Sequence, residues 1–68
     1  MIYKLENEYI ELFKLLKLLD LVDTGGQAKM IVAEGYVQRN GEVETRKRAK
    51  IVVGDILVVG DDVTIEVV

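Results

Sequence analysis

The stretch from Thr24 to Lys50, TGGQAKMIVAEGYVQRNGEVETRKRAK, decides the fold and differs in charge from the rest of the chain. It holds six basic and three acidic residues, a net charge of +3, whereas the other residues hold three basic and nine acidic residues, a net charge of −6. Thr24 is a good helix N-cap, and Gly35 is typical of a helix stop in the left-handed conformation. Asn40-Gly41 predicts a tight hairpin, because both central residues of a type I′ turn need positive φ. The stretch therefore predicts a short helix, a hairpin and then a cationic loop.

The segment from 11 to 19, ELFKLLKLL, gives the clearest helical pattern of the chain. Its leucines follow the i, i+3, i+4, i+7 spacing of one apolar stripe, at Leu12, Leu15, Leu16 and Leu19. Lys14 and Lys17 fall off that stripe. Glu11 is expected in the first turn, where a carboxylate suits the helix dipole and can pair with Lys14 three residues on.

Short apolar segments around these helices predict strands, at residues 2–5, 36–39, 42–43, 51–53, 56–59 and 63–68. Ile65 and Val67 alternate with polar residues and should share the buried face. Residues 44–50 are too charged for a buried strand and predict a surface loop, and Asp55 is expected to serve only in a turn. The prediction is an α+β fold with two short helices packed on a small, largely antiparallel sheet, forming a single domain over residues 1–68.

Composition narrows the function classes. A chain of 68 residues buries only about 60% of the surface it exposes when unfolded, so its core is thin and leaves no room for a deep cleft. The absence of cysteine and histidine argues against a disulfide, a zinc site and most nucleophilic or acid–base chemistry, so we expect no enzyme and no cofactor. We see no secretory signal and no apolar run near the ~20 residues that span a bilayer, and we expect a cytoplasmic protein without membrane attachment.

The order of these signals resembles the S-four-type RNA-binding domain family, named after a ribosomal small-subunit protein. The resemblance covers about residues 11–59, and its motifs follow the leucine-rich first helix, as Thr24-x-x-x-Ala28, Gly35-x-Val37, Asn40-Gly41 and Gly54-Asp55. The opening Thr24-Gly25-Gly26 and the run from Glu44 to Arg48 look most like the small stand-alone bacterial members. The resemblance implies the αL-type arrangement, in which two helices and the adjoining hairpin form a positive surface for structured RNA.

Two positions depart from the family pattern. Gly25 stands where many members carry an arginine, so one phosphate contact is missing. Arg39 stands where an apolar residue is common, and strand alternation places it on the same face as Val37. Either its aliphatic stem covers the edge of the core with its head in water, or the strand twists outward there. The part of Arg39 in RNA binding stays open on the sequence alone.

The candidate binding residues are the cations of the Thr24–Lys50 stretch and of the first helix. Arginine can pair with phosphate through two parallel N–H groups, whereas lysine acts as a point charge. The candidates are Lys29, Arg46, Lys47, Arg48 and Lys50, followed by Arg39, Lys14 and Lys17. A solvated loop and a wet helix face would account for the same residues without any binding. Tyr36 could stack on an unpaired base, although a half-buried strand tyrosine is the simpler expectation.

The hypothesis from the sequence is a non-catalytic, monomeric protein that binds structured RNA, either ribosomal or transfer RNA, through a local basic patch. The overall acidity, with a pI near 4.8, argues against general coating of nucleic acid and requires a polarised surface instead. Association with the ribosome fits this hypothesis, and a small-molecule substrate does not. The alternative is a small protein-interaction adaptor that uses the acidic face and the apolar sheet edge.

Overall fold

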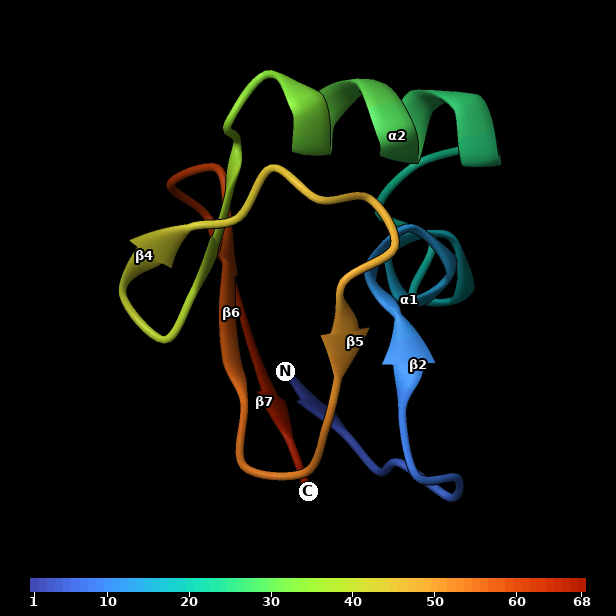
Figure 1. The fold of residues 1–68 in the computed structure, drawn as a ribbon, viewed down its shortest axis with the longest axis vertical. Coiled ribbons are helices and arrows are strands. Elements are labelled where there is room, and N and C mark those ends of the chain that lie inside the picture. The colour runs from blue at the N-terminus through green and yellow to red at the C-terminus, as the bar shows by residue number, and fades with distance from the viewer.

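The computed structural model describes residues 1–68 and has an α+β architecture, as predicted (Figure 1). The helices are α1 (Leu12–Leu18) and α2 (Gly25–Ala33). The strands are β1 (Ile2–Tyr3), β2 (Ile10–Glu11), β3 (Val37–Arg39), β4 (Glu42–Val43), β5 (Lys50–Ile51), β6 (Ile56–Val59) and β7 (Val63–Val67). Neither helix has the length and apolar character needed to cross a membrane.

The strands form one sheet of five and one separate pair. The five-stranded sheet has the order β1-β7-β6-β3-β4, in which only β1 and β7 run parallel. The separate pair is antiparallel and joins β2 to β5, with Glu11 opposite Lys50. This pairing brings the end of the cationic loop, which passes from β4 towards α1 in Figure 1, beside the start of the first helix.

The core lies between the helices and the sheet. The leucine stripe of α1 is buried at Leu12, Leu15 and Leu16, and α2 contributes Ala28 and Val32. From the strands come Val37, Ile51, Leu57, Ile65 and Val67. The predicted alternation of the last strand is therefore confirmed, because its buried residues are two positions apart and Thr64 and Glu66 between and beside them are exposed.

The local signals that open and close α2 act as predicted. The Thr24 hydroxyl accepts a hydrogen bond of 3.1 Å from the backbone N–H of Gln27. Gly35 follows the helix with φ of +83°, a conformation that glycine adopts without steric cost. Asn40 and Gly41 have φ of +52° and +87°, as a type I′ hairpin turn requires.

Four expectations need correction. Glu11 is not in the first turn of α1 but ends β2, directly before the helix. Within the expected strand at 51–53 only Ile51 is in β5, which it forms with Lys50, so the expected loop at 44–50 ends one residue early. Tyr36 precedes β3 and is 55% exposed rather than half-buried. Asp55 is buried and bonded to three other residues, as described below, so it is more than a turn residue.

Candidate nucleic-acid interface

Cationic side chains from three segments of the chain converge on the ring of Phe13. The distance to the ring centroid is 5.0 Å from Lys29 Nζ, 5.5 Å from Arg48 Cζ and 5.9 Å from Lys14 Nζ. All three lie within the roughly 6 Å at which a ring face attracts a cation. We define the Phe13 surface as Phe13, Lys14, Lys29, Lys47 and Arg48.

The backbone fixes this arrangement at the start of α1. The N–H groups of the first helical turn have no partner inside the helix. Here the N–H of Leu12 donates to the carbonyl of Ala49, and the N–H of Phe13 donates to the carbonyl of Lys47, each at 3.0 Å. These two bonds hold the cationic loop against α1. On the other side, a Cβ placed on Gly25 would lie 4.0 Å from Phe13 Cδ2, so the start of α2 also lies beside the ring.

One carboxylate belongs to this neighbourhood. Glu11 pairs with Lys14 at 3.0 Å, as predicted, and with Arg48 at 3.3 Å. The hydrogen bond from Lys14 lowers the pKa of Glu11 below its usual value, against a smaller opposing effect of burial and with further help from the charges of Lys14 and Arg48. Lys29 and Lys47 make no ion pair, so their charges are available to a ligand.

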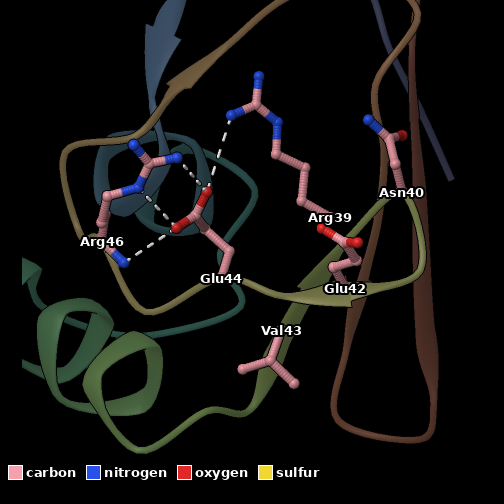
Figure 2. Close-up of a pocket in the computed structure, with 6 residues that line it drawn as sticks. All are labelled: Arg39, Asn40, Glu42, Val43, Glu44 and Arg46. Carbon is pink, nitrogen blue, oxygen red and sulfur yellow. Dashed lines mark hydrogen bonds and ion pairs between the residues drawn. The ribbon is translucent and has the colours of Figure 1, made fainter.

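The remaining arginines are held by a buried carboxylate, Glu44, which is only 8% exposed. Figure 2 shows Glu44 between Arg46 and Arg39. Arg46 donates to Glu44 from Nε at 3.0 Å, from Nη2 at 3.1 Å and from its backbone N–H at 3.2 Å, and Arg39 Nη1 lies 3.7 Å from Glu44 Oε1. The side-chain bond from Arg46 lowers the pKa of Glu44 and outweighs the opposing effect of burial, and the same contact raises the pKa of Arg46.

Asp55 is the second buried carboxylate, and it determines where the Arg39 side chain lies. It lies 2.8 Å from Arg39 Nη2 and accepts hydrogen bonds from Arg39 Nε at 3.1 Å, Asn40 Nδ2 at 2.9 Å and the Val52 N–H at 2.9 Å. Burial alone would raise the pKa of Asp55, but these bonds together outweigh it and lower the pKa. The head of Arg39 is therefore fixed by carboxylates rather than free in water, and its side chain is 23% exposed.

The structure divides the predicted cations into two groups and leaves one apart. Lys14, Lys29 and Arg48 meet at Phe13, and Lys47 is next to them along the loop, where its carbonyl accepts from the Phe13 N–H. Arg39, Arg46 and Lys50 lie towards β3 and β5, with Arg48 between the groups. Lys17 is exposed on α1, one turn beyond Phe13, and makes no ion pair.

Sequence reasoning missed Phe13, Glu44 and Asp55. The phenylalanine had a readable signal, since it is the only one in the chain and lies beside Lys14.

The chain matches the model of the S4 domain over residues 3–68. It is 51% identical over 49 residues to YbcJ of Escherichia coli (strain K12), covering 72% of this chain and 70% of YbcJ. It is 38% identical over 53 residues to "Probable ribosome maturation protein RlbA" of Bacillus subtilis (strain 168), covering 78% of this chain and 75% of RlbA.

A solved structure agrees with this match in three dimensions. The solution structure of YbcJ from E. coli, described as revealing an ALFAL motif involved in RNA-binding, aligns with a TM-score of 0.68 at 42% sequence identity. The alignment covers 96% of this chain and 85% of that chain. The resemblance seen in the ordered sequence motifs is thus confirmed, and the chain belongs to the S4 domain family.

Proposed function

We propose that this protein is a non-catalytic RNA-binding protein that recognises structured RNA through the Phe13 surface. The observation that carries the proposal is the convergence of Lys14, Lys29 and Arg48 on one ring from three separate segments. Two relatives support it, since the motif of YbcJ is described as involved in RNA-binding and RlbA is named for ribosome maturation. Ribosomal RNA is therefore the first ligand to test, and transfer RNA is the second.

Binding by this surface rests on phosphate neutralisation. Each phosphate neutralised by a lysine or arginine releases counterions, so affinity falls as salt rises. Lys29 and Lys47 keep their full charge, because neither is paired with a carboxylate, and the same holds for Lys17 and Lys50. The other contacts we propose are made by Lys14, Lys17, Arg39, Arg46, Arg48 and Lys50, within a motif spanning about residues 11–59.

The acidic remainder of the chain favours one orientation of approach. Outside the Thr24–Lys50 stretch the residues carry a net charge of −6, which repels RNA from the other faces. An acidic protein can in this way bind RNA at one place without coating it.

The test is a titration of structured ribosomal RNA at several salt concentrations with a Lys29→Gln/Lys47→Gln double variant. This change leaves no carboxylate without its partner, so the fold should be unaffected. The slope of log K against log salt should become shallower by roughly 1.4 to 1.8, at 0.7 to 0.9 per phosphate. Lys4→Gln is the matched control, because Lys4 is exposed, makes no ion pair and lies outside the Phe13 surface.

Salt-insensitive binding that is equal in the double variant and in the wild type would contradict the proposal. It would favour the alternative, an adaptor that contacts proteins through apolar residues. A loss of RNA affinity in Lys4→Gln as large as in the double variant would also contradict the proposal. The affinity would then depend on the net charge of the protein and not on the position of the lysines.

A further inference from the structure

A shallow hollow beside the Phe13 surface is lined almost entirely by cations. Its volume is about 390 Å³, and its lining consists of Arg39, Arg46, Arg48, Ala49 and Lys50. The cations come from β3, from the loop and from β5, and no carboxylate lines it. We call these five residues the arginine hollow. The neighbouring hollow in Figure 2 shares Arg39 and Arg46 but is also lined by Glu42 and Glu44, which makes it unsuited to an anion.

Each arginine of the arginine hollow is fixed by a carboxylate outside the lining. Asp55 holds Arg39 and Glu44 holds Arg46, at 2.8 and 3.0 Å, and Glu11 holds Arg48 at 3.3 Å. Arg39 Nη2 also donates to the Lys50 carbonyl at 2.8 Å, which ties the β3 side of the hollow to the β5 side. The guanidinium groups are thus oriented before any ligand arrives, and preorganisation of this kind reduces the cost of binding.

Hydrogen-bond donors remain after these contacts. A guanidinium carries five N–H donors. Arg46 uses Nε and Nη2 on Glu44 and keeps Nη1, whereas Arg48 uses only Nη1 and keeps Nε and Nη2. Lys50 Nζ makes no hydrogen bond or ion pair and lies 5.0 Å from the ring centroid of Tyr9. Three of the side chains that line the hollow therefore keep free donors.

We propose that the arginine hollow binds a single phosphate group and so provides a fixed point on the RNA backbone, a proposal that rests on the function proposed above. A planar fork of N–H donors matches phosphate oxygens, and a lysine adds a compact charge. The same chemistry would also accept a small phosphorylated molecule. The hollow differs from the Phe13 surface in that it offers oriented donors for one anion rather than separate charges along a strand.

The experiment follows the arginine Nε–H and backbone N–H signals by NMR while inorganic phosphate is added, with sodium chloride of equal ionic strength as the control. Phosphate should shift the signals of Arg39, Arg46, Arg48 and Lys50 to saturation, and chloride should not. Lys50→Gln should weaken phosphate binding by about three- to tenfold, the loss of one solvent-exposed polar contact. Arg46→Lys keeps the charge beside Glu44 but loses the fork, so it should also weaken binding, whereas Lys4→Gln should bind as the wild type does.

Ribosomal RNA provides the second arm, because it should displace inorganic phosphate from the hollow. Unmoved hollow signals, with RNA binding that still depends on Lys29 and Lys47, would overturn the phosphate site and leave the proposed function standing. Equal binding of phosphate by wild type and Lys50→Gln would overturn it as well. Saturable phosphate binding without RNA binding would support the phosphate site, assign it to a small phosphorylated molecule and contradict the proposed function.

Discussion

The Phe13 surface and the arginine hollow share Arg48 but differ in what holds their other cations. At Phe13, an aromatic ring gathers Lys14, Lys29 and Arg48, and the partly exposed Glu11 is the only carboxylate paired with them. In the hollow, Arg39 and Arg46 are fixed by the buried carboxylates Asp55 and Glu44. A ring holds a cation without cancelling its charge, whereas a carboxylate fixes the orientation of the cation and cancels much of its charge.

The difference assigns separate tasks to the two regions. Unpaired lysines contribute long-range attraction and salt dependence, because their full charge acts on the phosphates. Paired arginines contribute geometry, because their donors point in set directions. The arginines of the hollow are also tied to the folded chain, since the buried carboxylates Asp55 and Glu44 join Arg39 of β3 to the turn at Asp55 and to the loop at Arg46. Removing the carboxylates that fix the hollow should therefore affect stability, and changes at Phe13 should affect RNA binding.

The largest expected effect comes from removing Asp55. Asp55→Ala leaves Arg39, Asn40 and the Val52 N–H without their acceptor in a partly buried place. Breaking a buried pair by deleting one partner costs about 3–5 kcal/mol, a large part of the stability of a domain this small. Urea unfolding followed by circular dichroism measures the loss.

Glu11, the carboxylate beside the Phe13 surface, is the matched control for that change, because its partners Lys14 and Arg48 are exposed. Glu11→Gln removes the partner of Lys14 and Arg48, both of which remain in water, so it should lower stability much less than Asp55→Ala. Equal losses of unfolding free energy in the two variants would contradict the distinction between the two regions.

Acid should destabilise the hollow through both buried carboxylates. The pKa of Glu44 and the pKa of Asp55 are lower in the folded protein than their usual values of 4.5 and 3.8. A lowered pKa in the folded state means that the unfolded chain takes up protons first, so the stability is fully present above the usual pKa and is lost as pH falls through the lowered one. Urea unfolding between pH 7 and pH 3 should show stability falling below about pH 4.5.

Glu44→Gln separates the contribution of one carboxylate from the general effect of acid. Its stability at pH 7 should be lower, and its loss on acidification should be smaller than in the wild type. An acid-induced loss of the same size in both proteins would mean that Glu44 does not contribute to the pH dependence.

The smallest effect is expected at the ring itself. Phe13→Leu keeps an apolar side chain but loses the ring face, and one exposed cation–π contact is worth about 0.5–1 kcal/mol, or roughly two- to fivefold in RNA affinity. The salt slope should stay the same, because every cation remains. Titration of ribosomal RNA at several salt concentrations distinguishes this change from Lys29→Gln, which lowers the slope.

Phe13→Tyr is the matched variant, because it keeps an aromatic ring, and it should restore the affinity. Failure of tyrosine to restore what leucine loses would show that the ring acts through packing and not by holding cations. Unchanged affinity in Phe13→Leu would remove the ring from the binding mechanism altogether.

The parts of the fold that depend on neighbouring residues could be predicted from the sequence. The leucine stripe of α1, the cap at Thr24 and the turn at Asn40-Gly41 each act within a few positions, and each is found as predicted. The pairing of β2 with β5 could not be predicted, because it joins Glu11 to Lys50 through two strands of two residues each. Pairings this short carry no pattern of their own and depend on the surrounding fold.

The candidate site shows the same division. Strand alternation placed Arg39 on the core face, and a partly buried arginine favours a carboxylate partner, but no sequence pattern distinguished Asp55 from an ordinary turn residue. Phe13 could not be predicted as a site residue, because helical periodicity identifies only the leucine stripe and Phe13 lies beside that stripe. Lys29 of α2 and Arg48 of the cationic loop meet at the ring of Phe13, a contact that depends on how the elements pack and not on neighbouring positions.

The loop from Glu44 to Lys50 is fastened at both ends and in the middle. At its start, the Glu44 N–H donates to the Val37 carbonyl at 2.8 Å. At its end, the backbone of Lys50 lies opposite that of Glu11 in the β2–β5 ladder. Between them, the Ala49 N–H donates to the Arg46 carbonyl at 3.1 Å. Fixing the backbone of one residue costs about 1–2 kcal/mol of conformational entropy, and a loop that is free before binding loses that entropy when it binds. Here much of the loss has already occurred during folding. We therefore expect RNA to meet a loop that is already in its bound shape, so that association is not slowed by a search among loop conformations.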